Sequence, residues 1–147
     1  MINMAQRTDP YSSFNFLVEL DGVEIGGFSE VLGIKYETET EEFREGGIND
    51  FTHKLPKITK YGNLTLKRGM TDTADLYDWY RHVIAGIIEQ KKISIIQLDH
   101  PRQNEIKRWD FLNAYPVKWV GSDLKADGSS LSIETIEFAH QGIELVK

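Results

Sequence analysis

The chain of 147 residues contains no cysteine, and this absence excludes disulfide bonds and thiolate metal sites. It also lacks any apolar stretch close to the roughly 20 residues that a membrane-spanning helix needs. The N-terminus has no apolar region typical of a secretory signal peptide. The sequence therefore predicts a protein made in a cytoplasm without a signal peptide, with no membrane insertion by this chain alone.

Positive charge is outnumbered, because 17 Lys and Arg stand against 23 Asp and Glu, for a net charge of -6. A protein that grips nucleic-acid phosphates needs a basic face, so the composition gives no support to specific nucleic-acid recognition. The apolar share of 40% is enough to bury a core, and the length fits one domain over residues 1–147.

Patterns that carry catalysis or bind a cofactor are also missing. No histidine stands at metal-binding spacing with a second histidine, and the sequence has neither a nucleophile elbow nor a phosphate loop. Glutamates at alternate positions of a strand lie about 7 Å apart, which is too far for one calcium ion. We therefore expect no catalytic residues, no metal site, no cofactor and no enzymatic activity.

What the chain does have is alternation of apolar and polar residues with a period of two, which is typical of strands. The first alternating run, 14–20, is followed by Asp21-Gly22, a strong hairpin signal. Further strands are predicted at 23–25, 34–43, 63–68, 93–98, 106–113, 115–119 and 131–140. Pro116 predicts an edge or a bulge within its segment, since proline lacks the amide donor of a strand ladder.

One helix is predicted at 72–90, where apolar residues recur at spacings of three and four. These residues are Leu76, Trp79, Tyr80, Val83, Ile84, Ile87 and Ile88. Short turns between the strands favour antiparallel pairing. The predicted class is mainly β, an antiparallel β-barrel or sandwich with one packed α-helix. Its expected core includes Phe14, Phe16, Leu76, Trp79, Trp109 and Phe111.

The segment 34–60 does not fit a monomer's core. Its strand from Ile34 to Phe43 has no consistently apolar face, and five glutamates lie between Glu37 and Glu45. Residues 46–61 are interpreted as a long loop because of Gly46-Gly47, Pro56 and scattered lysines. Two interpretations stay open for the strand: a solvated edge, or an arm that pairs with another copy of the chain.

Several motifs stand in a fixed order along almost the whole chain: Asp9-Pro10-Tyr11 with residues 14–19, then 26–31 with Gly33, Tyr36-Glu37, 43–47, Leu55-Pro56, 64–69, 108–119 and 136–142. Together they resemble the T4-like contractile phage tail tube family. This family also supplies the inner tubes of extracellular contractile injection systems and contractile bacteriocins. A related ring protein of type VI secretion shares the fold of this family.

The resemblance implies a structural subunit whose hexameric rings stack into a tube around a lumen that conducts DNA or protein cargo. It implies these partners: further copies of the chain, a sheath protein, baseplate or tube-initiator proteins, terminator proteins, and a tape-measure protein or cargo in the lumen. The particle would be a virion tail or an extracellular injection particle. The sequence leaves open which of these applies, and whether the chain is the main tube subunit or a minor paralogue.

We expect the contacts between subunits and between rings to come from the N-terminal arm, 1–12, and from segment 34–60. The residues proposed for these contacts are Asp9, Tyr11, Glu37, Glu39, Glu41, Glu42, Phe43, Arg44, Glu45, Gly46, Gly47, Asn49, Lys54, Lys57 and Lys60. Two other functions are weighed against assembly: a soluble small-molecule-binding β-barrel, which needs an apolar interior pocket, and a small hydrolase.

Overall fold

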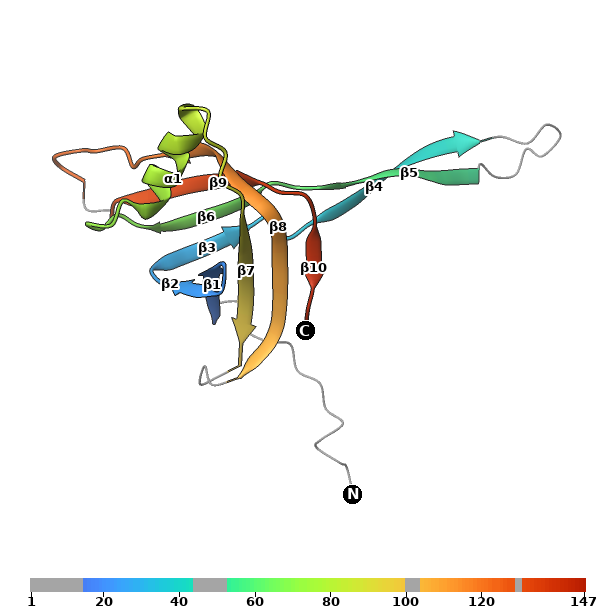
Figure 1. The fold of residues 1–147 in the computed structure, drawn as a ribbon, viewed down its shortest axis with the longest axis horizontal. Helices are drawn as coiled ribbons and strands as arrows, with labels where there is room; N and C mark the ends of the chain where they lie inside the picture. Colours follow the sequence, from blue (N-terminus) through green and yellow to red (C-terminus); the bar gives the residue numbers. More distant parts are fainter. Residues whose placement is uncertain (1–14, 44–52, 100–103, 129–130) are drawn as a thin grey trace, which may run out of the picture.

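The computed structural model describes residues 15–43, 53–99, 104–128 and 131–147 (Figure 1). Its elements are β1 (Phe16–Leu20), β2 (Val23–Ile25), β3 (Phe28–Leu32), β4 (Tyr36–Phe43), β5 (His53–Tyr61), β6 (Leu64–Gly69), α1 (Asp75–Ile84), β7 (Lys91–Leu98), β8 (Glu105–Val120), β9 (Ile133–Ala139) and β10 (Ile143–Leu145). The predicted class is confirmed, because the described elements are antiparallel strands and one helix.

Eight strands form the body of the molecule in the order β2-β1-β7-β8-β9-β6-β3, with β10 paired to β8. The long strand β8 belongs to two layers: its first half pairs with β7 and β10, and its second half pairs with β9. Asn113 has a φ of 50°, and the register shifts between Pro116 and Lys118. Such irregularities let one strand turn a corner from one layer to the next.

The sequence divides this strand into two segments, 106–113 and 115–119, whereas the structure shows one bent strand. Pro116 lies beside the irregularity, as its missing amide donor predicts. Strands β3 and β10 are not predicted, because each is short and has no long alternating pattern. In the described residues, no pairing joins β2 to β3 at the two ends of the strand order, so the eight strands do not close a barrel.

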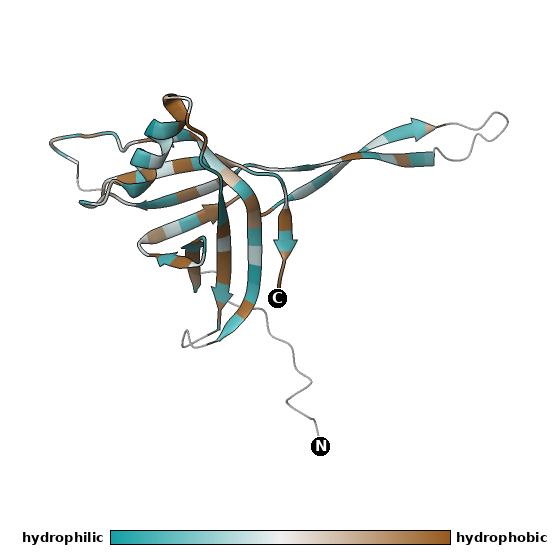
Figure 2. Ribbon diagram, viewed as in Figure 1, coloured by the Kyte–Doolittle hydropathy of each residue, from teal (hydrophilic) through white to brown (hydrophobic). Residues whose placement is uncertain are grey.

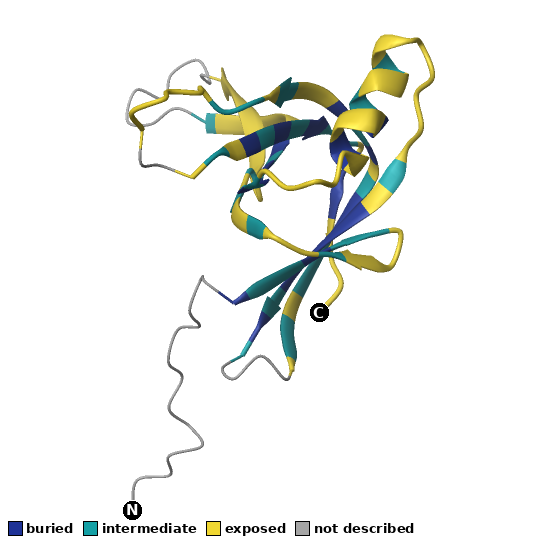
Figure 3. Ribbon diagram, turned by 90° about the vertical axis from the view of Figure 1, so that its left-hand side faces the viewer, coloured by how far each residue is buried: buried dark blue, intermediate teal, exposed yellow. Residues whose placement is uncertain are grey.

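The core lies between the two layers and under α1 (Figure 3). Leu76, Trp79 and Phe111 are buried as predicted, with exposed fractions of 1%, 4% and 0%. Phe16 and Trp109 are partly buried and pack against this core. Phe14, the remaining predicted core residue, lies outside the described residues.

The helix is shorter than the predicted range of 72–90. It ends because Gly86, with a φ of 89°, takes the left-handed conformation common at helix C-termini. The amides of Gly86 and Ile87 donate to the carbonyls of Val83 and His82, which closes a Schellman-type cap. Ile87 and Ile88 therefore do not extend the buried stripe, and they are 61% and 58% exposed.

Candidate assembly surface

Strands β4 and β5 form a two-stranded sheet of their own, separate from the eight strands of the body. The pair projects as a long arm (Figure 1). Every residue of β4 is exposed, and every residue of β5 except His53 is exposed. Isolated two-stranded hairpins are marginally stable in water. The arm, Tyr36–Phe43 with His53–Tyr61, is called the hairpin below.

The strand β5 corrects the interpretation of residues 46–61 as a long loop. From His53 to Tyr61 the chain pairs antiparallel with β4, with Tyr36 opposite Tyr61 and Phe43 opposite His53. Pro56 and the lysines suggested a loop, but proline is compatible with a strand that has an open edge. The polar strand of the sequence prediction therefore has a partner within its own chain along one edge.

The base of the hairpin is fastened to the body by aromatic residues. The Tyr36 hydroxyl donates a hydrogen bond of 2.9 Å to the Ile143 carbonyl of β10. The rings of Tyr36 and Tyr61 meet edge to face, with centroids 5.3 Å apart. His140 lies against Tyr61 and against buried Phe111, at centroid distances of 5.8 Å and 5.0 Å. These contacts set the direction in which the hairpin leaves the body.

Gly33 is required where the chain enters the hairpin. Its φ is 103°, and a Cβ atom there would lie 2.0 Å from the carbonyl oxygen of Asn63. Only glycine accepts both the conformation and the close approach. The crossing of the two chain segments at the hairpin's base thus depends on one residue without a side chain.

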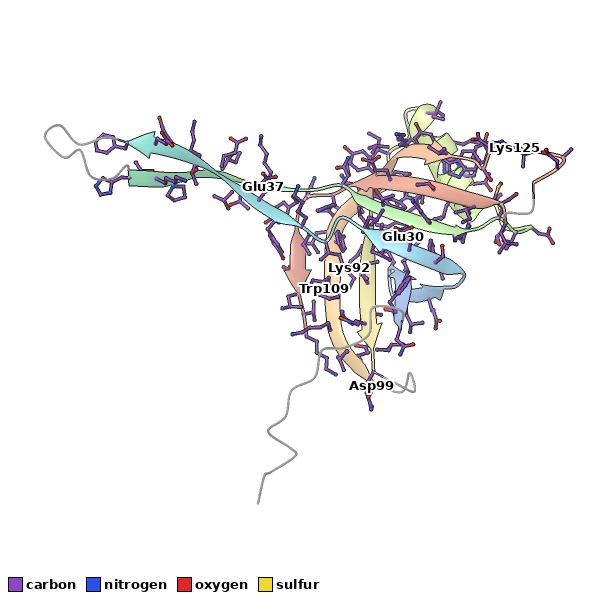
Figure 4. All side chains as sticks on the ribbon, turned by 180° about the vertical axis from the view of Figure 1, so that it is seen from behind. Glu30, Glu37, Lys92, Asp99, Trp109 and Lys125 are labelled. Atoms are coloured by element: carbon purple, nitrogen blue, oxygen red, sulfur yellow. The ribbon has the colours of Figure 1, made fainter. Side chains whose placement is uncertain are left out.

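The inner half of the hairpin satisfies its own polar groups. The Thr38 and Thr59 hydroxyls are 2.9 Å apart, and Lys60 Nζ donates to Glu39 Oε1 at 2.5 Å. The hydrogen bond from Lys60 to Glu39, with the charge of Glu39, raises the pKa of Lys60. Lys35 lies 3.4 Å from Glu37, labelled in Figure 4. These contacts lie at the base of the hairpin and up to the bulge.

The outer half begins at a bulge. The register shifts between the pairs Thr38–Thr59 and Thr40–Pro56, so β5 places two residues, Lys57 and Ile58, opposite one residue of β4. A bulge changes the direction of the side chains around it.

From the bulge outward, four charged side chains of the described strands have no ion pair. Among the described residues, no ion pair within 4.0 Å involves Glu41, Glu42, Lys54 or Lys57. Three apolar side chains are also uncovered there: Phe43, Leu55 and Ile58 are 50%, 50% and 59% exposed. Figure 2 shows a few brown, hydrophobic bands along an arm that is otherwise mostly teal or white. Exposed apolar side chains next to unpaired charges are typical of a contact surface.

The structure thus gathers eight of the predicted contact residues on one hairpin. They are Glu37, Glu39, Glu41, Glu42, Phe43, Lys54, Lys57 and Lys60. The other seven lie outside the described residues: Asp9, Tyr11, Arg44, Glu45, Gly46, Gly47 and Asn49. The sequence prediction missed Leu55 and Ile58, because a segment interpreted as a loop gives no reason to single out apolar residues.

The body contains a hydrogen-bonded cluster built around a buried ion pair. Arg68 on β6 and Glu134 on β9 are each 5% exposed, and Arg68 Nε donates to Glu134 Oε1 at 2.5 Å. Arg68 also pairs with Asp75 at the start of α1, and the Trp119 indole donates to Glu134 Oε2 at 2.9 Å. Burial disfavours ionised Asp75, but its hydrogen bond to Arg68 and the charge of Arg68 outweigh this and lower its pKa. The cluster joins helix and sheet.

Among residues 15–43, 53–99, 104–128 and 131–147, no group of three or more histidine, aspartate or glutamate side chains is placed to hold a metal ion. Within the same ranges, no helix has the length and apolar character needed to cross a membrane.

Comparisons with known proteins agree on one architecture. The model of the family described as T4-like virus tail tube protein gp19 matches residues 12–144. No curated protein sequence matches the chain significantly. In the anti-feeding prophage baseplate, one chain is 24% identical, with a TM-score of 0.85 over 95% of this chain and 97% of that chain.

Two further solved structures show the same fold. A chain of the sheath-tube complex of the extracellular contractile injection system PVC, in its extended state, is 22% identical, with a TM-score of 0.85 over 99% of this chain and 98% of that chain. The protein Hcp1 of Flavobacterium johnsoniae is 19% identical, with a TM-score of 0.60 over 90% of this chain and 95% of that one.

Proposed function

This chain belongs to the T4-like virus tail tube protein family, and from that premise we propose that its copies form hexameric rings that stack into an inner tube. The role of the family is structural: its members are the subunits of a tube. The observation that carries the finer proposal is the hairpin, whose outer half has charged and apolar side chains that its own chain leaves uncovered.

Ring formation accounts for the open edges of the molecule. The hairpin has one free edge on β4 and one on β5, and the strand order of the body ends at β2 and β3. Exposed strand edges favour aggregation unless they are covered. A closed ring of identical copies covers equivalent edges on every subunit, and head-to-tail contacts generate such a ring when the rotation closes.

The proposed partners follow from the complexes in which similar folds occur. The similar chains come from structures of a sheath-tube complex, a baseplate and a tube-terminating cap. We extend these partners to this chain: a sheath around the tube, baseplate or initiator proteins at one end and a terminator at the other. A tape-measure protein or cargo would occupy the lumen. The subunit would act without catalysis, be made in a bacterial cytoplasm and function in an extracellular particle or virion tail.

The main alternative, a small-molecule-binding barrel, has one observation in its favour. A groove of about 660 Å³ lies between β3 and the strands β1, β7 and β8, and Phe16, Phe28, Ile95 and Trp109 are among its lining residues. It lies along the seam where β1 and β3 do not pair, and it is open to solvent. Ligand pockets enclose most of the ligand surface, so this seam fits a contact between subunits better.

The experiment combines light scattering after size-exclusion chromatography with negative-stain electron microscopy of the purified protein. Rings or stacked tubes are expected, and their rotational averages should show sixfold symmetry. A protein that stays monomeric at all concentrations, with and without a crowding agent, would contradict the proposal. Rings of another symmetry would contradict the sixfold arrangement alone.

A further inference from the structure

The two strands of the hairpin carry charges of opposite sign. All four charged residues of β4 are glutamates: Glu37, Glu39, Glu41 and Glu42. All three lysine, arginine or acidic residues of β5 are lysines: Lys54, Lys57 and Lys60. A hairpin selected only for solubility would have both signs interspersed on both strands. Solubility alone therefore does not explain why β4 carries only negative charges and β5 only lysines.

Pairing within the hairpin accounts for part of this pattern. Lys60 binds Glu39 at 2.5 Å, and Lys60 also stands opposite Glu37 in the register. Lys54 stands opposite Glu42, yet no ion pair within 4.0 Å joins these two described residues. Glu41, Glu42, Lys54 and Lys57 thus remain available for contacts outside the chain.

Because β4 and β5 form a sheet of their own, the two edges of the hairpin differ in the charge of their side chains. Because β4 and β5 pair only with each other, each has one edge that faces away from the hairpin. One of these edges is lined by glutamates and the other by lysines. Side-by-side hairpins related by a two-fold axis would place β4 beside β4, or β5 beside β5, and would oppose like charges. Hairpins arranged head to tail would place β4 beside β5.

We propose that hairpins of neighbouring copies lie side by side, with the β4 glutamates of one copy against the β5 lysines of the next. The occupant of each edge is a second copy of this chain, and the inference rests on the proposed tube function. The like-charge edges exclude two-fold dimers, which would block ring closure. The apolar side chains of Phe43, Leu55 and Ile58 supply contact area among the charges. Pro56 removes one backbone donor from β5, so side chains carry more of the contact at that position.

Charge reversal with complementation tests this arrangement. The first variant, Glu41→Lys with Glu42→Lys, makes the outer half of both edges basic, and the second, Lys54→Glu with Lys57→Glu, makes the outer half of both edges acidic. Each alone should reduce sedimentable tubes by about tenfold or more, because like charges then meet at every contact. An equimolar mixture should restore tubes to within about twofold of wild type, since acidic and basic hairpins can alternate. The fourfold variant that combines both sets should assemble by itself.

The mixture is the decisive arm, because contacts inside one hairpin cannot be restored by a second chain. No recovery in the mixture, or normal tubes from either variant alone, would overturn the proposal. The matched control is Lys118→Glu with Lys125→Glu, which changes the net charge by the same amount as the second variant. Both lysines are exposed, and Lys125 lies at the end of the molecule opposite the hairpin (Figure 4). This control should form tubes as wild type does.

A cross-linking measurement keeps the test informative if a charge variant folds poorly. The chain has no cysteine, so Glu42→Cys and Lys54→Cys in two differently tagged copies introduce unique thiols. A short bismaleimide should link the two tags in the mixture and should give few dimers with either variant alone. Equal linking of Glu42→Cys to itself would overturn the head-to-tail arrangement. If wild type and control form no tubes, the tube function itself fails, and this outcome is distinct from failure of the charge variants only.

Discussion

The body and the hairpin follow the same antiparallel pairing rules but end with different surfaces. In the body, strands such as β6 and β9 bury one face, where Leu64, Leu66, Ile136 and Phe138 are at most 1% exposed. In the described residues, no buried side-chain nitrogen or oxygen lacks a hydrogen-bond partner. The hairpin buries almost nothing, and four of its seven glutamate and lysine side chains have no ion pair among the described residues. The body satisfies its buried groups within one chain, whereas the outer half of the hairpin is proposed to contact another copy.

The largest expected effect comes from removing the hairpin while keeping its base. A variant in which an Asn-Gly turn joins Tyr36 directly to Tyr61 should lose tube assembly completely and remain folded, because the core lies entirely in the body. Electron microscopy and thermal unfolding would be measured together. Tubes of normal length from the folded variant would show that the hairpin is dispensable for assembly.

The next comparison sets one large apolar residue of the body against one of the hairpin. Phe138→Ala should lower the free energy of unfolding by about 3–5 kcal/mol, because it leaves a cavity in a fully buried site. Ile58→Ala should change it by less than about 0.5 kcal/mol, since the side chain is 59% exposed. Denaturant titration of unassembled protein measures both. A similar loss for both variants would contradict the proposed division of roles.

The loss of an ion pair should also destabilise the protein more in the body than in the hairpin. Glu134→Ala removes the buried partner of Arg68 and the acceptor of the Trp119 indole, and should cost about 2–4 kcal/mol. Glu39→Ala removes the exposed partner of Lys60 and should cost less than about 1 kcal/mol. The measurement is again denaturant unfolding. A neutral Glu134→Ala would mean that water or Asp75 fully replaces the lost contact.

The smallest expected effect concerns how the stability of the body depends on pH. The pKa of Asp75 is lowered in the folded state, so its contribution to stability is present above its unfolded pKa of about 3.9 and is lost as pH falls through the folded pKa. Asp75→Asn should therefore flatten the melting temperature profile below about pH 4. If the melting temperature of Asp75→Asn fell with acid as steeply as that of wild type, other carboxylates would be responsible for the acid sensitivity.

Local signals in the sequence were enough to predict much of the body. Asp21-Gly22 predicted the β1–β2 turn, and alternation predicted a strand at 131–140, where the structure has β9. The helix end was missed although Gly86 marks it, because the apolar spacing continues through Ile87 and Ile88. Spacing alone does not reveal where the backbone leaves the helical conformation.

The hairpin was predicted less completely, for a physical reason. A strand without a buried face has no alternation to mark it, so β5 resembled a loop. Its register depends on contacts such as Tyr36 with Tyr61 and Tyr36 with Ile143, which lie far apart in the sequence. The unusual charge of residues 37–45 did single out the segment that contains β4. The opposite charge of β5 became meaningful only once the two strands were seen to pair.

The hydrogen bond from Tyr36 to Ile143 has a mechanical consequence. Ile143 is the first residue of β10 and pairs with Phe111 on β8, the strand shared by both layers. A pull on the hairpin would pass along the backbone into β3 and β6, and this bond would transfer part of it to β8, the one described strand that belongs to both layers, so the tension would be shared between the layers. A tube that is driven forward as a rod would then be held together, at each subunit, by a joint made at the foot of the arm.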